Sequence, residues 1–214
     1  MRRSAVYALV ALLTLVFASP AAAGESNWKV YTYNPSGNAL SSHQADEGPA
    51  FTFTTESDTA LFAAQHLAGA DTLTGKTITA TFRIDAAGAT FHYWGENTPS
   101  NACGTPASVR LYFSSNGSFG SKKDWYSNFW WSNSAGSSHV LVDGPLVTIT
   151  ASVSPGNWSN WNGQQGTVQP DGFAAAAADP ALIGFSFGGG CFYENGVGAT
   201  GAPATFTLTR FIIR

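Results

Sequence analysis

The clearest strand in this sequence is Thr77-Ile78-Thr79-Ala80-Thr81-Phe82-Arg83-Ile84. Apolar residues occupy every second position, and three threonines and an arginine occupy the positions between them. Because neighbouring side chains of a β-strand point to opposite faces of the sheet, this alternation predicts a strand with one buried face and one solvent face. The same pattern returns at 147–153 and at 204–209, so half-buried strands dominate the predicted fold.

Shorter candidate strands lie on both sides of this stretch, at 50–54, 60–63, 90–94, 108–113, 128–131, 139–142 and 183–187. Turn residues separate them, as at Asn195-Gly196. A helix is predicted only for the alanine-rich residues after Asp171, where Asp171 would cap the first turn and Pro180 would end the helix. Many short strands and one short helix predict an all-β protein, an antiparallel β-sandwich.

The apolar pattern changes phase near the C-terminus. Phe206 and Leu208 share one phase, whereas Phe211 and Ile213 share the other. A β-bulge near Arg210 would bring both pairs to the same face of the sheet. The alternative is a terminal strand that is buried on both faces.

The composition excludes several classes of protein. Charged residues make up 11% of the chain, against roughly 25% in an average globular protein, which argues against a helical bundle with charged helix surfaces. The formal net charge of −3 argues against a basic protein that binds nucleic acid. The hydrophobic share of 44% is ample for a core and argues against disorder.

The N-terminal segment has the three parts of a secretory signal peptide. Two arginines follow Met1, an apolar run covers 5–17, and small residues fill 19–23. The apolar run is shorter than the about 20 residues that a membrane span needs, and we expect no membrane span elsewhere. We therefore predict a signal peptide at 1–23, a single domain at 24–214, and a monomer secreted to the extracellular space.

The two cysteines, Cys103 and Cys191, predict one disulfide, because an even number of cysteines in a secreted chain is usually paired. The bond would draw Glu96 and Glu194, which both follow aromatic residues, to the same end of the sandwich. Three interpretations stay open for these two acids. They are a catalytic pair, the rim of a sugar-binding site, or two solvated loop residues.

Tryptophans offer a second kind of site, because sugars stack their C–H faces on aromatic rings and pair their hydroxyls with polar side chains. Trp158 and Trp161 lie in a loop rich in Asn and Ser and fit this requirement best. The alternative is that the tryptophans are core residues of a sandwich with few charges. The complete set of candidate ligand-binding residues is Trp94, Trp125, Trp158, Trp161, Tyr193, Glu96 and Glu194.

No cofactor or catalytic metal is predicted. The run Gly188-Gly189-Gly190 leads to a cysteine and not to a helix, so we expect a close-packed turn and not a phosphate-binding loop. Asp46-Glu47-Gly48 could contribute ligands to a structural calcium ion.

The order of segments resembles a known family. Leu73-Thr74-Gly75-Lys76 leads into an alternating strand, and Ser108–Phe113, Trp130-Trp131-Ser132, a loop with tryptophan, a short alanine helix and Ile183–Gly190 follow in turn. Over residues 73–214 this resembles the galactose-binding-like jelly rolls of secreted bacterial proteins, many of which are carbohydrate-binding modules. The resemblance implies a jelly-roll sandwich that binds sugars on a concave sheet face or in end loops, often with structural calcium.

Three functions follow, in order of preference. The first is a non-enzymatic, lectin-like protein that binds a polysaccharide or glycan. The second is a small glycoside hydrolase or lyase that uses Glu96 and Glu194. The third is an envelope or matrix protein that acts by protein contact, which an exposed apolar patch would favour.

Overall fold

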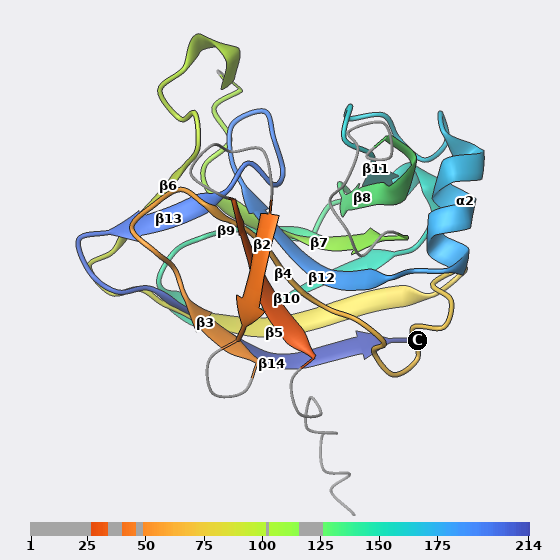
Figure 1. Cartoon of the computed structure of the whole chain (residues 1–214), viewed down its shortest axis with the longest axis horizontal. Coiled ribbons are helices and arrows are strands. Elements are labelled where there is room, and N and C mark those ends of the chain that lie inside the picture. Colours follow the sequence, from red (N-terminus) through yellow and green to blue (C-terminus); the bar gives the residue numbers. More distant parts are fainter. Residues whose placement is uncertain (1–26, 34–39, 46–48, 102, 116–125) are drawn as a thin grey trace, which may run out of the picture.

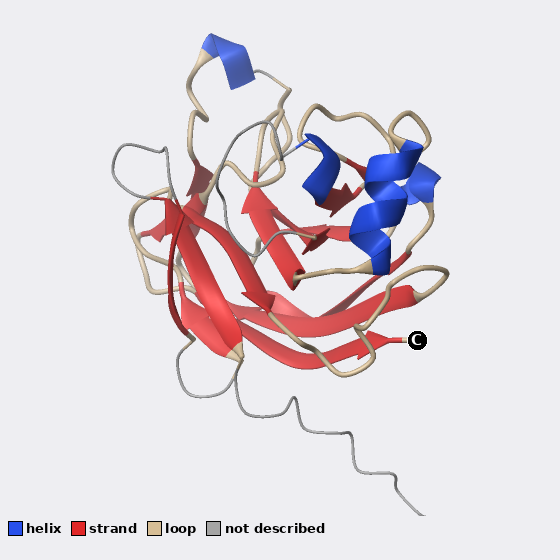
Figure 2. Ribbon diagram, turned by 45° about the vertical axis from the view of Figure 1, so that its right-hand side comes forward, coloured by secondary structure: helices blue, strands red, loops and turns tan. Residues whose placement is uncertain are grey.

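The structure is a computed structural model, and it describes residues 27–33, 40–45, 49–101, 103–115 and 126–214. Two antiparallel sheets lie face to face, with a helix at one end of the sandwich (Figures 1 and 2). The predicted all-β antiparallel sandwich is therefore confirmed. Within these residues, no helix is long and apolar enough to span a bilayer. The predicted signal peptide lies outside the described residues.

The larger sheet has ten strands within the described residues. Its main path runs in the order β11 (Trp158–Ser159), β8 (Phe129–Ser132), β7 (Ser108–Ser114), β12 (Leu182–Gly188), β4 (Thr59–Ala64), β1 (Trp28–Tyr33) and β2 (Leu40–Gln44). Three further strands extend it: β13 (Val197–Thr200) pairs with β4 and with β6 (Thr90–Tyr93), and β9 (Ser138–Val140) pairs with β7. The central strand β12 is buried at every position, so both faces of this sheet are covered there.

The smaller sheet has the order β10 (Gly144–Ser152), β5 (Thr77–Asp85), β14 (Thr205–Ile213) and β3 (Ala50–Thr52). Strand β5 is the alternating stretch, and it pairs with both of its neighbours. Threonines on the solvent side of β5 form hydrogen bonds with threonines of the neighbouring strands, as in the contact of 2.9 Å between the hydroxyls of Thr81 and Thr148. This polar surface explains how the sandwich faces water with few charges.

The register of β14 shifts relative to β5 between Leu208 and Arg210. The predicted β-bulge is thus confirmed. After the bulge, Phe211 and Ile213 pack against the same core as Phe206 and Leu208, and the alternative of a strand buried on both faces is excluded.

The helix α2 (Pro170–Ala178) confirms the predicted position, with one correction at its start. Pro170 takes the first helical turn and Gln169 precedes it, so Asp171 lies inside the helix and does not cap it. Phe173 anchors the helix, since its ring lies 5.1 Å from Trp130 and 5.9 Å from Phe113. Short 3₁₀ turns occur at η1 (Pro99–Asn101) and η2 (Pro155–Asn157).

Phenylalanine rings fill the space between the sheets. The fully buried ring of Phe206 lies at their centre, 4.8 Å from Phe82 and 5.2 Å from Phe185. It also contacts Phe51, Phe62 and Phe187 at 5.5–5.9 Å between ring centroids. This ring layer holds the larger sheet against the smaller one.

We predict that Phe206→Ala lowers the free energy of unfolding by about 3–5 kcal/mol, because it leaves a cavity among rings that cannot close over it. Urea unfolding followed by tryptophan fluorescence measures the loss. Thr207→Ala is the matched control, since its side chain points to the other face of the same strand, and it should cost less than about 1 kcal/mol. Equal losses for the two variants would contradict the assigned core.

Candidate functional site

The larger sheet has a second apolar face, which points away from the smaller sheet and which we call the outer face. Strand register places Leu61 beside Tyr31, Ser186 beside Leu61, and Arg110 beside Ser186. The next row across the sheet contains Ala63, Gly184, Tyr112, Trp131 and Ser159. A hydrophobic cluster separate from the core covers these rows and includes Tyr31, Leu61, Tyr112, Phe129 and Trp131.

Aromatic rings on the outer face contact one another across the strands. The ring of Tyr112 lies 5.8 Å from Trp131 and 6.2 Å from Phe129. Trp161, from the loop after β11, lies 6.2 Å from Trp131 and is only partly buried. The result is an aromatic surface that begins inside the sheet and reaches solvent at Trp161.

Polar atoms lie among these rings without partners. The buried atoms Arg110 Nε, Trp131 Nε1, Ser159 Oγ and Ser186 Oγ have no hydrogen-bond partner within the described residues. A buried polar group without a partner costs about 1–3 kcal/mol, and most folds avoid this cost. These four atoms are shielded from solvent, so they form a polar set beneath the surface of the outer face.

Glu194 reaches this face from the loop between β12 and β13. Its side chain is 5% exposed, and its Oε1 accepts a hydrogen bond of 3.3 Å from the hydroxyl of Tyr33. Burial raises the pKa of Glu194 to about 8, and the bond from Tyr33 opposes this shift only in part. The carboxyl is therefore mainly protonated at pH 7 and can donate a hydrogen bond as well as accept one.

Arg110 carries a positive charge on the outer face, next to the pocket residue Tyr193. Its guanidinium carbon lies 3.9 Å from the centroid of the Tyr193 ring, and its Nη1 donates a hydrogen bond of 3.3 Å to the carbonyl oxygen of Ser132. Burial lowers the pKa of Arg110, and Tyr193 opposes that shift. Arginine stays charged in proteins, so this site holds a cation stacked on an aromatic ring.

A small pocket of about 60 Å³ opens where two loops meet above Trp131. Its walls are formed by Trp131, Asn160, Trp161, Gly163, Cys191, Phe192, Tyr193 and Glu194. Asn160 shapes the first loop, because its Oδ1 accepts bonds of 3.0 Å from the backbone N–H groups of Asn162 and Gln164. This turn holds Trp161 at the mouth of the pocket.

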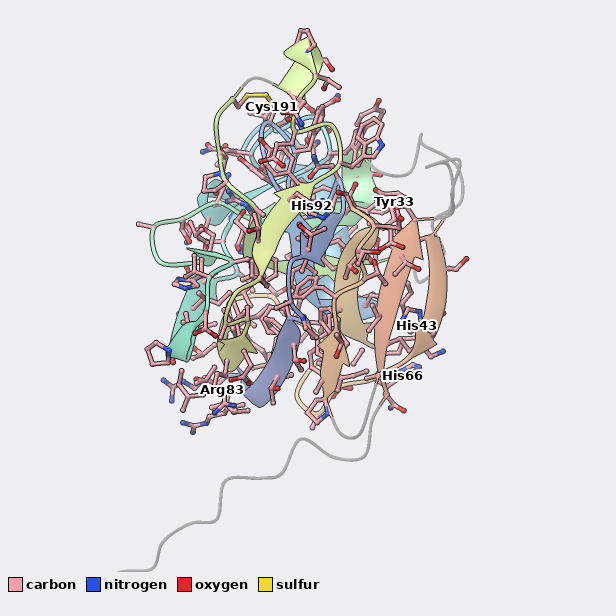
Figure 3. The ribbon with its side chains drawn as sticks, turned by 90° about the vertical axis from the view of Figure 1, so that its left-hand side faces the viewer. Tyr33, His43, His66, Arg83, His92 and Cys191 are labelled. Atoms are coloured by element: carbon pink, nitrogen blue, oxygen red, sulfur yellow. A yellow bond between two sulfur atoms is a disulfide. The ribbon has the colours of Figure 1, made fainter. Side chains whose placement is uncertain are left out.

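The second loop is fixed by a disulfide and by close glycine packing. The predicted bond between Cys103 and Cys191 is confirmed. In Figure 3 it lies near the top of the molecule, above Tyr33 and His92, and His43 and His66 lie toward the opposite end. The amide N–H of Cys191 donates a hydrogen bond of 2.5 Å to Asn101 Oδ1.

The glycine run forms the close-packed turn that the sequence predicts. A Cβ on Gly189 would collide with the ring of Tyr93, and one on Gly190, whose φ is 64°, would collide with Asn101. Asn195 closes the loop, because its Oδ1 accepts a bond of 2.9 Å from the N–H of Gly189 and its Nδ2 donates to the carbonyl of Trp94 at 2.7 Å. The loop therefore presents Tyr193 and Glu194 to the outer face.

The structure brings together only part of the predicted site. Trp161, Tyr193 and Glu194 line the same pocket. Trp94 is 63% exposed on a separate loop, and Glu96 is exposed on that loop and is absent from the pocket lining. The disulfide joins the loops that carry Glu96 and Glu194, as expected. The side chain of Glu194 is buried, however, whereas that of Glu96 is exposed.

Trp158 is a core residue. Its side chain is fully buried against Phe113 at 4.8 Å, and its Nε1 donates a bond of 2.9 Å to the carbonyl of Ser152. The prediction that Trp158 offers a ring to a ligand is therefore not supported by its position. Strand β11 explains this outcome, because alternation sends Trp158 to the core and Ser159 to the outer face.

Two further predictions fall on segments that lie outside the described residues, namely Trp125 and the calcium candidate Asp46-Glu47-Gly48. Among the residues that are described, no group of three or more His, Cys, Asp or Glu side chains is placed to hold a metal ion.

Arg110, Tyr33 and Trp131 were not among the predicted ligand-binding residues. For Arg110 the sequence did contain a signal, namely the alternation of strand β7. Val109, Leu111 and Phe113 point into the core, so Arg110 and Tyr112 must point to the opposite face of the sheet. Comparison of the chain with protein-family models, with curated proteins and with solved structures found no match. The site is therefore interpreted from its own chemistry.

The raised pKa of Glu194 predicts a pH-dependent stability. The unfolded chain releases this proton near the ordinary value of 4.5, whereas the folded protein holds it up to about 8. Glu194 therefore makes the wild type lose stability as the pH rises from about 4.5 to about 8, by at most about 1.4 kcal/mol per pH unit. Glu194→Gln removes this loss, because an amide does not ionise.

Urea unfolding at pH 5, 6.5 and 8 tests this prediction. The stability of Glu194→Gln relative to wild type should increase over this range and change little above it. Glu96→Gln serves as the control, since Glu96 is exposed, and its curve should run parallel to that of the wild type. A Glu194→Gln curve that is parallel too would show that Glu194 ionises with an ordinary pKa.

Proposed function

We propose that this protein is a secreted, non-enzymatic carbohydrate-binding protein whose ligand contacts the outer face of the larger sheet. The observation that carries the proposal is the pocket at the edge of this face, where the rings of Trp131 and Trp161 meet Asn160 and the buried carboxyl group of Glu194. Hydroxyl groups of a sugar can bond to the polar atoms of this lining, and the C–H faces of the sugar can stack on the rings.

The pocket places the two kinds of contact side by side. Trp131 and Trp161 form an aromatic wall, and Asn160 and Glu194 add polar atoms to the same lining. A mostly apolar recess with a few polar groups is the general form of a small-ligand site. A site on a sheet face also agrees with the resemblance to galactose-binding-like jelly rolls.

Secretion is part of the proposal and is supported by two features. The disulfide between Cys103 and Cys191 is of the kind that persists in oxidising compartments outside the cytoplasm. The segment at 1–23 has the pattern of a signal peptide.

A small glycoside hydrolase or lyase is the second candidate, favoured by Glu194, since a carboxyl with a raised pKa is suited to general-acid chemistry. Hydrolysis by the usual mechanism needs two carboxyl groups that flank one bond. Among the described residues, Glu194 is the one carboxyl group in the pocket lining. Binding without hydrolysis is therefore the better-supported function. Release of reducing ends or of unsaturated products by the wild type, abolished in Glu194→Gln, would favour the enzyme instead.

We predict that Trp161→Ala weakens glycan binding about tenfold or more, which corresponds to about 1.4 kcal/mol, because the ring forms the open wall of the pocket. The measurement is retention of the processed protein on a panel of insoluble polysaccharides, followed by calorimetry with the best oligosaccharide. The unfolding midpoint of the variant should stay near that of the wild type, because Trp161 is only partly buried.

Trp94→Ala is the matched control, since Trp94 is exposed and lies outside the pocket lining. Its binding should equal that of the wild type if the ligand is confined to the outer face. A wild-type protein that is retained by none of the polysaccharides, with no change in tryptophan fluorescence, would exclude the proposed function.

A further inference from the structure

Arg110 carries a positive charge for which the described residues provide no counter-ion. The ion pair that they do contain joins Arg83 and Asp85 at 2.6 Å, on exposed positions of the smaller sheet. The carboxyl group of the pocket, that of Glu194, is buried, and its raised pKa keeps it mainly protonated at neutral pH. Within the described residues, Arg110 thus has no carboxylate paired with it, although the whole chain has a formal net charge of −3.

This charge is partly removed from water and is incompletely bonded. A guanidinium has five N–H donors. One of its nitrogens, Nη1, bonds to the carbonyl of Ser132, and Nε is buried without a partner. Tyr193 stacks on the group but offers no negative charge for an ion pair. Proteins rarely bury a cation without pairing it, because the lost hydration is not recovered.

We propose that the ligand of this site is an acidic glycan, and that a uronate carboxylate of this glycan pairs with the Arg110 guanidinium. This inference rests on the proposed function and specifies its ligand class. A carboxylate matches the planar fork of an arginine and accepts two parallel hydrogen bonds from it. It supplies the negative charge that the described residues do not place beside Arg110.

The neighbours of Arg110 suit the same ligand. A protonated Glu194 adds a hydrogen-bond donor to the site and does not repel an anion. Tyr193 contacts Arg110 and also lines the pocket, so one ring joins the cation to the surface on which a sugar would stack. A neutral glycan would leave the charge of Arg110 unpaired.

The size of the pocket indicates how the sugar would lie. Its volume of about 60 Å³ is well below that of the cavity of about 150 Å³ that holds a benzene ring in another protein. The pocket therefore takes a substituent of a sugar and not the whole ring, which would rest on Trp161 and Tyr193 at the mouth.

The test compares each acidic polymer with its own neutral derivative. The probes are polygalacturonate, alginate and hyaluronate oligosaccharides and the fully methyl-esterified form of each, measured by calorimetry at pH 6.5 and low salt. We expect at least one acid to bind the wild type, and its ester to bind tenfold or more weakly. Binding of the acid should weaken further as sodium chloride is raised from 50 to 500 mM.

Arg110→Gln should remove the preference, so that the ratio of the acid affinity to the ester affinity falls to about one. Arg83→Gln is the matched control, because it removes a positive charge from the smaller sheet, and it should keep the wild-type ratio. The comparison of acid with ester on the wild type stands on its own if Arg110→Gln does not fold.

The remaining outcomes separate this inference from the proposed function. Equal binding of acids and esters, or binding of neutral glycans alone, overturns the acidic ligand and leaves carbohydrate binding in place. Binding of dextran sulfate but of no uronate, or of free acetate but of no oligosaccharide, overturns the uronate assignment. Absence of binding to every glycan overturns both.

Discussion

The layer of phenylalanine rings between the two sheets is the contact on which the rest of this structure depends. Because side chains of a strand alternate between faces, the placement of Phe113 and Phe185 in that layer sends Tyr112 and Ser186 to the opposite face. The core therefore decides more than stability. It also fixes which side chains form the outer face, and it holds them in register across six strands.

The outer face becomes a site only because a loop closes over its edge. The disulfide and the glycine run bring the loop after β12 against the segment that holds Asn101. This closure buries Glu194 and covers Arg110 with Tyr193. Burial then changes the chemistry of both ionisable groups, since it favours the neutral acid and makes the unpaired cation costly. The electrostatic character of the site is thus a consequence of packing.

Prediction from the sequence succeeded where the pattern is local and strong. The alternating stretch at β5, the bulge before Arg210 and the disulfide were all expected and are present. It missed β1, β2 and β13. In β1, Tyr31 and Tyr33 pack into the hydrophobic cluster of the outer face, so the alternation of polar and apolar residues is lost. It also grouped Trp158 with Trp161 as loop residues, whereas a two-residue strand turns the first toward the core.

The sequence by itself determined the class of the fold, the position of the strand that organises it, and the pairing of its two cysteines, because side-chain periodicity and cysteine number are properties of the chain alone. Tertiary structure decided which aromatic rings are core and which line a pocket, that Glu194 and not Glu96 is buried, and that Arg110 belongs to the site. These features depend on residues far apart in the sequence that meet only when ten strands pair. Which loops close over the outer face, and which of its polar atoms then lack partners, depends on contacts between distant segments, so no pattern along the chain could reveal them.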